Sequence, residues 1–92
     1  MTLVNSLKLI KEARDNKAAI PAFNIHNLET AQGVIEAAAE EDSPVMIATT
    51  PGTLRHAGVK CIAGIVKNTA KQYKIPVALH LDHCSDYDKV IQ

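Results

Sequence analysis

Three mainly apolar runs, each ending in polar residues, alternate along the chain with segments in which apolar residues recur every three or four positions. The runs lie at 18–24, 44–50 and 75–82. Continuous apolar runs of this length are typical of strands buried on both faces, as in a parallel sheet. The first run is the weakest strand prediction, because Pro21 has no N–H to donate to a central ladder.

The segments between these runs have the spacing of amphipathic helices. We predict helices at 5–16, 28–41 and 59–73. The middle helix has the clearest apolar stripe, and Asn27 is its predicted N-cap. The stretch PGTLRHAG at 51–58 is predicted to be a turn.

The order of these elements predicts consecutive strand–helix–strand units. The strands start near 18, 44 and 76, separations of 26 and 32 residues, which match right-handed crossovers between parallel strands. After the third strand, Ser85 is predicted to cap the start of a further helix. The fold class is therefore α/β with parallel strands, in a doubly wound sheet or in part of a (β/α)8 barrel. The first strand lacks the GxGxxG turn of the usual dinucleotide-binding sheet.

The composition of the chain argues against nucleic-acid partners and against a membrane location. Ten basic residues balance ten acidic ones among 92, so no net charge favours nucleic acid. The sequence has no run of 18 apolar residues, so no membrane span is predicted. Charged residues come too early at the N-terminus for a signal peptide. We expect one soluble, cytoplasmic domain at most.

Polar residues follow all three predicted strands. They are Asn24 with His26 and Asn27, Thr49 with Thr50, and Asp82 with His83. The carboxyl ends of parallel strands meet at one edge of a sheet, where α/β proteins carry their sites. Strand alternation places His80 and Asp82 on one face. A histidine beside a carboxylate suits a metal, but catalytic zinc needs three protein ligands.

A structural interpretation of the same residues stays open. In it, Asp82 caps the turn that follows its strand, and the neighbouring histidines are satisfied by local hydrogen bonds. His26 and His56 lie in strand-end loops, where histidines are mostly solvated.

Three segments carry a family resemblance that covers essentially the whole chain. They are PAFNIHNLET at 21–30, PVMIATTPGT at 44–53 with HAG at 56–58, and AKQYKIPVALHLDH at 70–83. These segments resemble the class II, zinc-dependent ketose-bisphosphate aldolases, and their wording is most similar to the tagatose-1,6-bisphosphate aldolase branch. The resemblance implies that residues 1–92 are a single partial domain, the N-terminal part of a (β/α)8 TIM barrel with about three βα units.

The resemblance also implies roles for four residues. Asp82 matches the catalytic acid/base and His83 a zinc ligand, while Asn24 and Thr50 match residues that bind substrate. The implied reaction is reversible cleavage of tagatose or fructose 1,6-bisphosphate to dihydroxyacetone phosphate and glyceraldehyde 3-phosphate. Zinc is the implied Lewis acid, and the aspartate moves the C4 hydroxyl proton.

The family's other two zinc histidines, its phosphate-binding loops and its mobile-loop glutamate have no counterpart in these 92 residues. The resemblance implies a homo-oligomer, with or without an accessory subunit. The alternative function is an inactive fragment, and we expect the isolated chain to be inactive and either oligomeric or marginally stable. A lysine Schiff-base enzyme is disfavoured, because no predicted strand ends in lysine.

Overall fold

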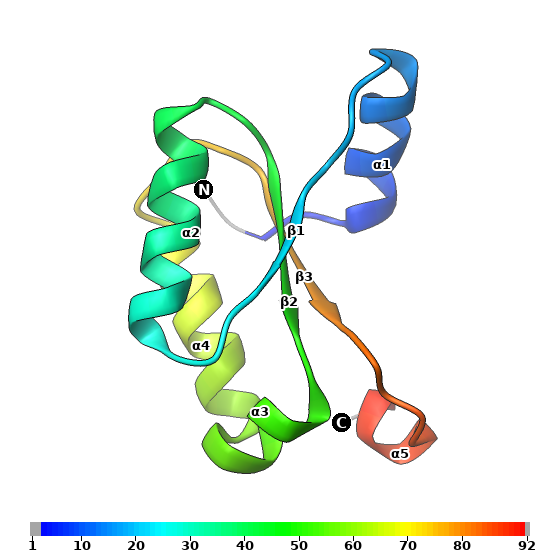
Figure 1. Ribbon diagram of the computed structural model, residues 1–92, viewed down its shortest axis with the longest axis vertical. Coiled ribbons are helices and arrows are strands. Elements are labelled where there is room, and N and C mark those ends of the chain that lie inside the picture. Colours follow the sequence, from blue (N-terminus) through cyan, green and yellow to red (C-terminus); the bar gives the residue numbers. More distant parts are fainter. Residues whose placement is uncertain (1–2, 92) are drawn as a thin grey trace.

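Three parallel strands form the sheet that the apolar runs predict (Figure 1). They are β1 (Ala22–Asn24), β2 (Val45–Thr49) and β3 (Val77–Leu81), in the spatial order β1-β2-β3. The structure is a computed structural model that describes residues 3–91, with the backbone alone at positions 89 and 91. The predicted α/β class with parallel strands is confirmed.

Five helices accompany the strands in the described part of the chain. They are α1 (Ser6–Asp15), α2 (Leu28–Glu40), α3 (Pro51–Ala57), α4 (Val59–Ala70) and α5 (Tyr87–Ile91). Helices α2 and α4 pack together on one side of the sheet, and α1 lies on the other side (Figure 1). The predicted N-cap of α2 is confirmed, since Asn27 Oδ1 accepts the backbone N–H of Thr30 at 2.9 Å. None of the helices described is long and apolar enough to cross a membrane.

Alternate residues of the two longer strands face the helices and build the core. Val45 and Ile47 of β2 and Val77 of β3 are at most 1% exposed. They pack with Ile35 of α2 and Val66 of α4 in one cluster. Because side chains alternate along a strand, the residues between them project from the opposite face of the sheet.

The first strand is shorter and more exposed than the sequence predicts. β1 covers only Ala22–Asn24 of the predicted run at 18–24, and all three residues are exposed. Pro21 contributes only its carbonyl, which accepts the N–H of Met46 at 2.9 Å. Within the described sheet β1 pairs with β2 alone, so its other edge and its side chains remain open. The prediction of a buried strand was wrong here.

A short helix replaces the turn predicted at 51–58. Helix α3 starts with Pro51 at its first position, where a missing N–H costs nothing and the fixed φ suits a helix. Gly58 ends it at φ 91°, a backbone conformation that favours glycine. Seven residues are too few for an apolar period to be visible in the sequence.

The last two predicted helix boundaries also shift. Helix α4 ends at Ala70, whereas periodicity extended it to residue 73. The cap of α5 is not Ser85: the Oδ1 atom of Asp86 accepts the backbone N–H of Asp88 at 3.0 Å. A carboxylate one position before the first helical residue reaches this N–H directly, so the cap moves by one residue.

Candidate active site

Asn24 and His80 lie in one row across the sheet, on either side of Ala48. The register pairs Asn24 with Ala48, and Ala48 with His80. These residues alternate with the core residues Ile47 and Leu79, so they project from the face opposite α2 and α4. Two of the predicted polar strand ends therefore meet on the same face.

Asp82 continues this face one step beyond β3. Its backbone N–H donates to the carbonyl of Thr49 at 2.7 Å, which ties the carboxyl end of β3 to β2. Its side chain is 41% exposed and lies between two histidines: His80 Nε2 is 3.7 Å from Oδ1, and His83 Nε2 is 3.6 Å from Oδ2. The predicted pair of His80 and Asp82 on one face is thus present, with both carboxylate oxygens facing imidazole nitrogens.

His83 reaches the same carboxylate because its backbone leaves strand geometry. In a regular strand, consecutive side chains point to opposite faces. His83 instead has φ 56°, a left-handed conformation that is uncommon for residues other than glycine. Its N–H donates to Asp82 Oδ1 at 3.0 Å, which holds this turn in place. The side chains of Asp82 and His83 therefore lie together on one small region of the surface.

The two threonines at the end of β2 have different surroundings. Thr49 faces the helices: it is 4% exposed, and its Oγ1 has no hydrogen-bond partner in the described part of the chain. It lines an apolar cavity of about 160 Å³ together with Leu54 and Ile62. Thr50 is half-buried beside α3, and its hydroxyl makes no capping hydrogen bond. Thr50 is thus the threonine left available at the carboxyl end of β2.

The two loop histidines, His26 and His56, also have different surroundings. His26 is exposed, as predicted for a loop, but its Nδ1 hydrogen-bonds with Oγ1 of the buried Thr53 at 2.7 Å. This contact joins the end of β1 to α3, a structural role that sequence reasoning missed because α3 was not predicted. His56 is exposed on α3.

Sequence reasoning also missed Arg55. A polar cavity of about 310 Å³ lies between the start of α3 and the segment after β3, and Arg55 and His83 both line it. The helical period of α3 would have been the only signal in the sequence for this meeting, and it is too short to detect.

The residues described do not form a zinc site by themselves. Within residues 3–91, no three side chains of His, Cys, Asp or Glu lie where they could hold an ion together. His80 and His83 both direct Nε2 at the carboxylate of Asp82. Catalytic zinc takes three protein ligands and keeps one position open, so this donor set is incomplete.

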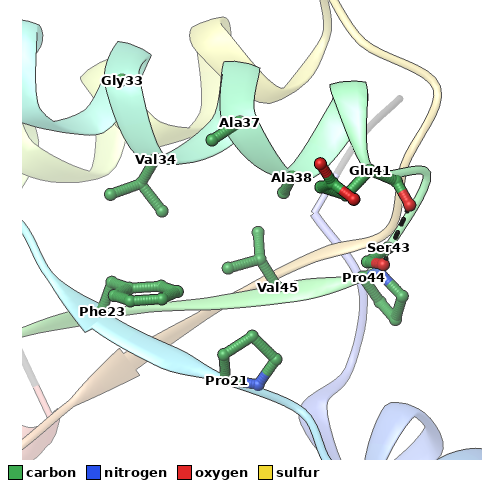
Figure 2. Close-up of a pocket in the computed structure, with 10 residues that line it drawn as sticks. All are labelled: Pro21, Phe23, Gly33, Val34, Ala37, Ala38, Glu41, Ser43, Pro44 and Val45. Carbon is green, nitrogen blue, oxygen red and sulfur yellow. Dashed lines mark hydrogen bonds between the residues drawn. The ribbon is translucent and has the colours of Figure 1, made fainter.

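An apolar groove lies away from these polar groups. Figure 2 shows this cavity of about 530 Å³ between β1 and the second half of α2, with Phe23 below Val34. Pro44 and Val45 line it at the amino end of β2. Parallel α/β proteins carry their chemistry at the opposite, carboxyl end, so the groove belongs to packing rather than catalysis.

The sequence model of the family fructose-bisphosphate aldolase class-II matches residues 4–92. Among solved structures, the YdjI aldolase of Escherichia coli K12 is 28% identical with a TM-score of 0.86, over 97% of this chain and 34% of that chain. A candidate fructose-1,6-bisphosphate aldolase of Coccidioides immitis is 33% identical with a TM-score of 0.80, over 88% of this chain and 30% of that one. The chain thus spans about a third of these proteins and has the fold of part of an aldolase TIM barrel.

Proposed function

This chain belongs to the class II fructose-bisphosphate aldolase family, and on that premise we propose that it carries the acid/base wall of an aldolase site. The proposed reaction is reversible cleavage of a ketose 1,6-bisphosphate to dihydroxyacetone phosphate and glyceraldehyde 3-phosphate. The observation that carries the proposal is the carboxylate of Asp82, held between His80 and His83 at the carboxyl end of β3.

Asp82 is the proposed acid/base. In the cleavage direction a carboxylate oxygen takes the C4 hydroxyl proton of the ketose, and in condensation it returns that proton to the aldehyde oxygen. The side chain is open enough to meet substrate, while the hydrogen bond from its N–H to Thr49 fixes its backbone. A fixed backbone with an accessible carboxylate is what proton transfer at a defined atom requires.

Asn24 and Thr50 are the proposed substrate-binding residues. Asn24 shares the face of His80, and its amide can both donate to and accept from sugar hydroxyls. The Thr50 hydroxyl is not used to cap α3, so it is available to a ligand. Asn24 ends β1 and Thr50 follows β2, so both lie at the carboxyl edge of the same sheet as Asp82, which favours contact with the same substrate molecule.

Zinc is the proposed cofactor, and when bound it would polarise the substrate ketone. His83 is the residue of this chain that we propose as a ligand. The donor set within residues 3–91 is incomplete, so the remaining ligands are proposed to come from the part of the barrel outside this chain.

The proposed sugar is tagatose 1,6-bisphosphate, following the branch that the sequence most resembles. Tagatose and fructose bisphosphates differ only in configuration at C4, the carbon whose hydroxyl Asp82 addresses. Comparing kcat/KM for the two sugars on the complete enzyme tests this choice, and a large preference for fructose bisphosphate would reverse it.

Two substitutions in the complete enzyme test the proposed roles. Asp82→Ala is expected to lower turnover by about 10²–10⁴-fold with zinc content unchanged, because it removes only the proton carrier. His83→Ala is expected to lose zinc, measured by elemental analysis after dialysis, and His56→Ala on the exposed surface of α3 is the matched control. Equal zinc loss in Asp82→Ala and His83→Ala would contradict the separation of roles.

The second candidate function is a non-catalytic barrel segment. It is favoured by the open edge of β1 and by the incomplete donor set. Measurable cleavage of a ketose bisphosphate by the isolated 92-residue chain would exclude the second candidate.

A further inference from the structure

We propose that Arg55 binds the phosphate of the aldehyde half of the substrate, the half released as glyceraldehyde 3-phosphate. This inference rests on the proposed aldolase function and adds to it a specificity-determining residue. It follows from the polar cavity between α3 and the segment after β3.

Arg55 is a cation that forms no ion pair in the described part of the chain. The ion pairs found there are Arg14–Asp15, His80–Asp82 and His83–Asp82, and none includes Arg55. Its guanidinium lines the polar cavity of about 310 Å³ beside His83 and Ser85. Arginine has five N–H donors in a planar fork that matches phosphate oxygens, so an unpaired guanidinium in a polar cavity suits a phosphate group.

Gly52 leaves space between the guanidinium and a hydroxyl. A Cβ placed on Gly52 would lie 3.8 Å from Nη2 of Arg55 and 3.8 Å from Oγ1 of Thr50. Both polar groups therefore border the volume above Gly52, and both can donate a hydrogen bond to an oxygen there. The Thr50 oxygen accepts no capping hydrogen bond from α3, so the side chain is not tied to the helix end.

The cavity borders the candidate active site at His83. His83 lines it, and Nε2 of His83 is 3.6 Å from the Asp82 carboxylate that is proposed to handle the C4 hydroxyl. C4 belongs to the aldehyde half of the sugar. The phosphate nearer to Arg55 is therefore that of the aldehyde half.

One acidic residue in the cavity would repel a phosphate, so removing its charge should strengthen phosphate binding. Asp86 lines the same cavity, and its Oδ1 is held by the N–H of Asp88. Its charge weakens the attraction for an anion. Asn caps a helix as well as Asp does, so Asp86→Asn removes the charge and keeps the cap.

The experiment measures condensation by the complete enzyme, with dihydroxyacetone phosphate and either glyceraldehyde 3-phosphate or unphosphorylated glyceraldehyde. Arg55→Met is expected to raise the KM for glyceraldehyde 3-phosphate by about 10- to 100-fold, the worth of a hydrogen bond to a charged group. The KM values for glyceraldehyde and for dihydroxyacetone phosphate are expected to stay unchanged, as is kcat. Arg14→Met, on the exposed surface of α1, is the matched loss of a guanidinium.

Two further variants sharpen the result. Asp86→Asn is expected to lower the KM for glyceraldehyde 3-phosphate by about two- to fivefold, the size of a partly exposed charge effect. Gly52→Ala makes only ordinary van der Waals contacts and is compatible with α3, yet its methyl group enters the space between Arg55 and Thr50. It is expected to raise the same KM while Arg55 is intact.

The outcomes separate this inference from the proposed function. A wild-type enzyme with no aldolase activity contradicts the proposed function, and titration with inorganic phosphate by calorimetry then tests Arg55 directly. The inference survives only if phosphate binding is lost in Arg55→Met and kept in Arg14→Met. In an active enzyme, an unchanged KM for glyceraldehyde 3-phosphate in Arg55→Met, or an equal rise for unphosphorylated glyceraldehyde, would overturn the inference.

Discussion

The two faces of the sheet differ in how nearly complete they are. On the face toward α2 and α4, Val45, Ile47 and Val77 are sealed into a core that these 92 residues supply alone. On the opposite face, Asn24 and His80 are exposed on either side of Ala48. The chain therefore completes the packing over β2 and β3 by itself, whereas the face that carries the candidate chemistry is only partly enclosed.

The packing face has one unfinished border, at β1. Phe23 and Ile47 are register partners on neighbouring strands, yet Phe23 is 50% exposed and Ile47 is fully buried. β1 has a neighbour on one side only, so the apolar groove between β1 and α2 stays open (Figure 2). The packed core therefore ends at β1, where strand pairing also ends.

The largest expected effect comes from breaking the finished face. Ile47→Ala is expected to lower the free energy of unfolding by about 2–5 kcal/mol, since it leaves a cavity in the core. Urea denaturation followed by circular dichroism measures it. His80→Ala, one position past its register partner on the open face, is the control and should change stability by no more than about 0.5 kcal/mol. Similar losses in both variants would show that the two faces do not differ in this way.

The next effect concerns the unfinished border. An exposed apolar groove beside an unpaired strand edge favours association, so the isolated chain is expected to self-associate. Phe23→Lys is expected to weaken that association by about tenfold or more, the worth of burying one aromatic side chain. Sedimentation velocity measures the shift. Tyr87→Lys removes a 75% exposed aromatic of α5 and is the control. A monomeric wild-type chain would contradict the expectation.

The smallest effect separates two buried threonines, Thr49 at the end of β2 and Thr53 on α3. Thr49 Oγ1 has no partner in the described structure, whereas Thr53 Oγ1 hydrogen-bonds with His26. Thr49→Val is expected to raise the free energy of unfolding by about 1 kcal/mol, and Thr53→Val to lower it by a similar amount. Thermal and urea unfolding of both variants measure the two signs. A loss of stability in Thr49→Val would mean that its hydroxyl is satisfied in solution.

Much of the fold could be predicted from the sequence, because the elements that build the core have clear apolar patterns. β2 and β3 lie in mainly apolar runs, and α2 has an apolar stripe with Asn27 at its start. The misses have physical causes. Helix α3 is too short to show a period, and the length of β1 depends on neighbours rather than on its own residues.

The candidate site likewise has some features that the local sequence predicts and others that depend on the backbone fold. Alternation along one strand is enough to place His80 and Asp82 on one face. It would send His83 to the other face, and only the left-handed backbone at φ 56° brings it back. The row of Asn24, Ala48 and His80 depends on strand register, which no local pattern contains. The roles proposed for Asp82, His83, Asn24 and Thr50 stay predictions.

The spatial order β1-β2-β3 is also the order of synthesis. Each new strand is added beside the one made just before it, so the sheet can grow while the polypeptide leaves the ribosome, at about 5–20 residues per second. The open edge of β1 is then the oldest surface of the nascent sheet and the one exposed for longest.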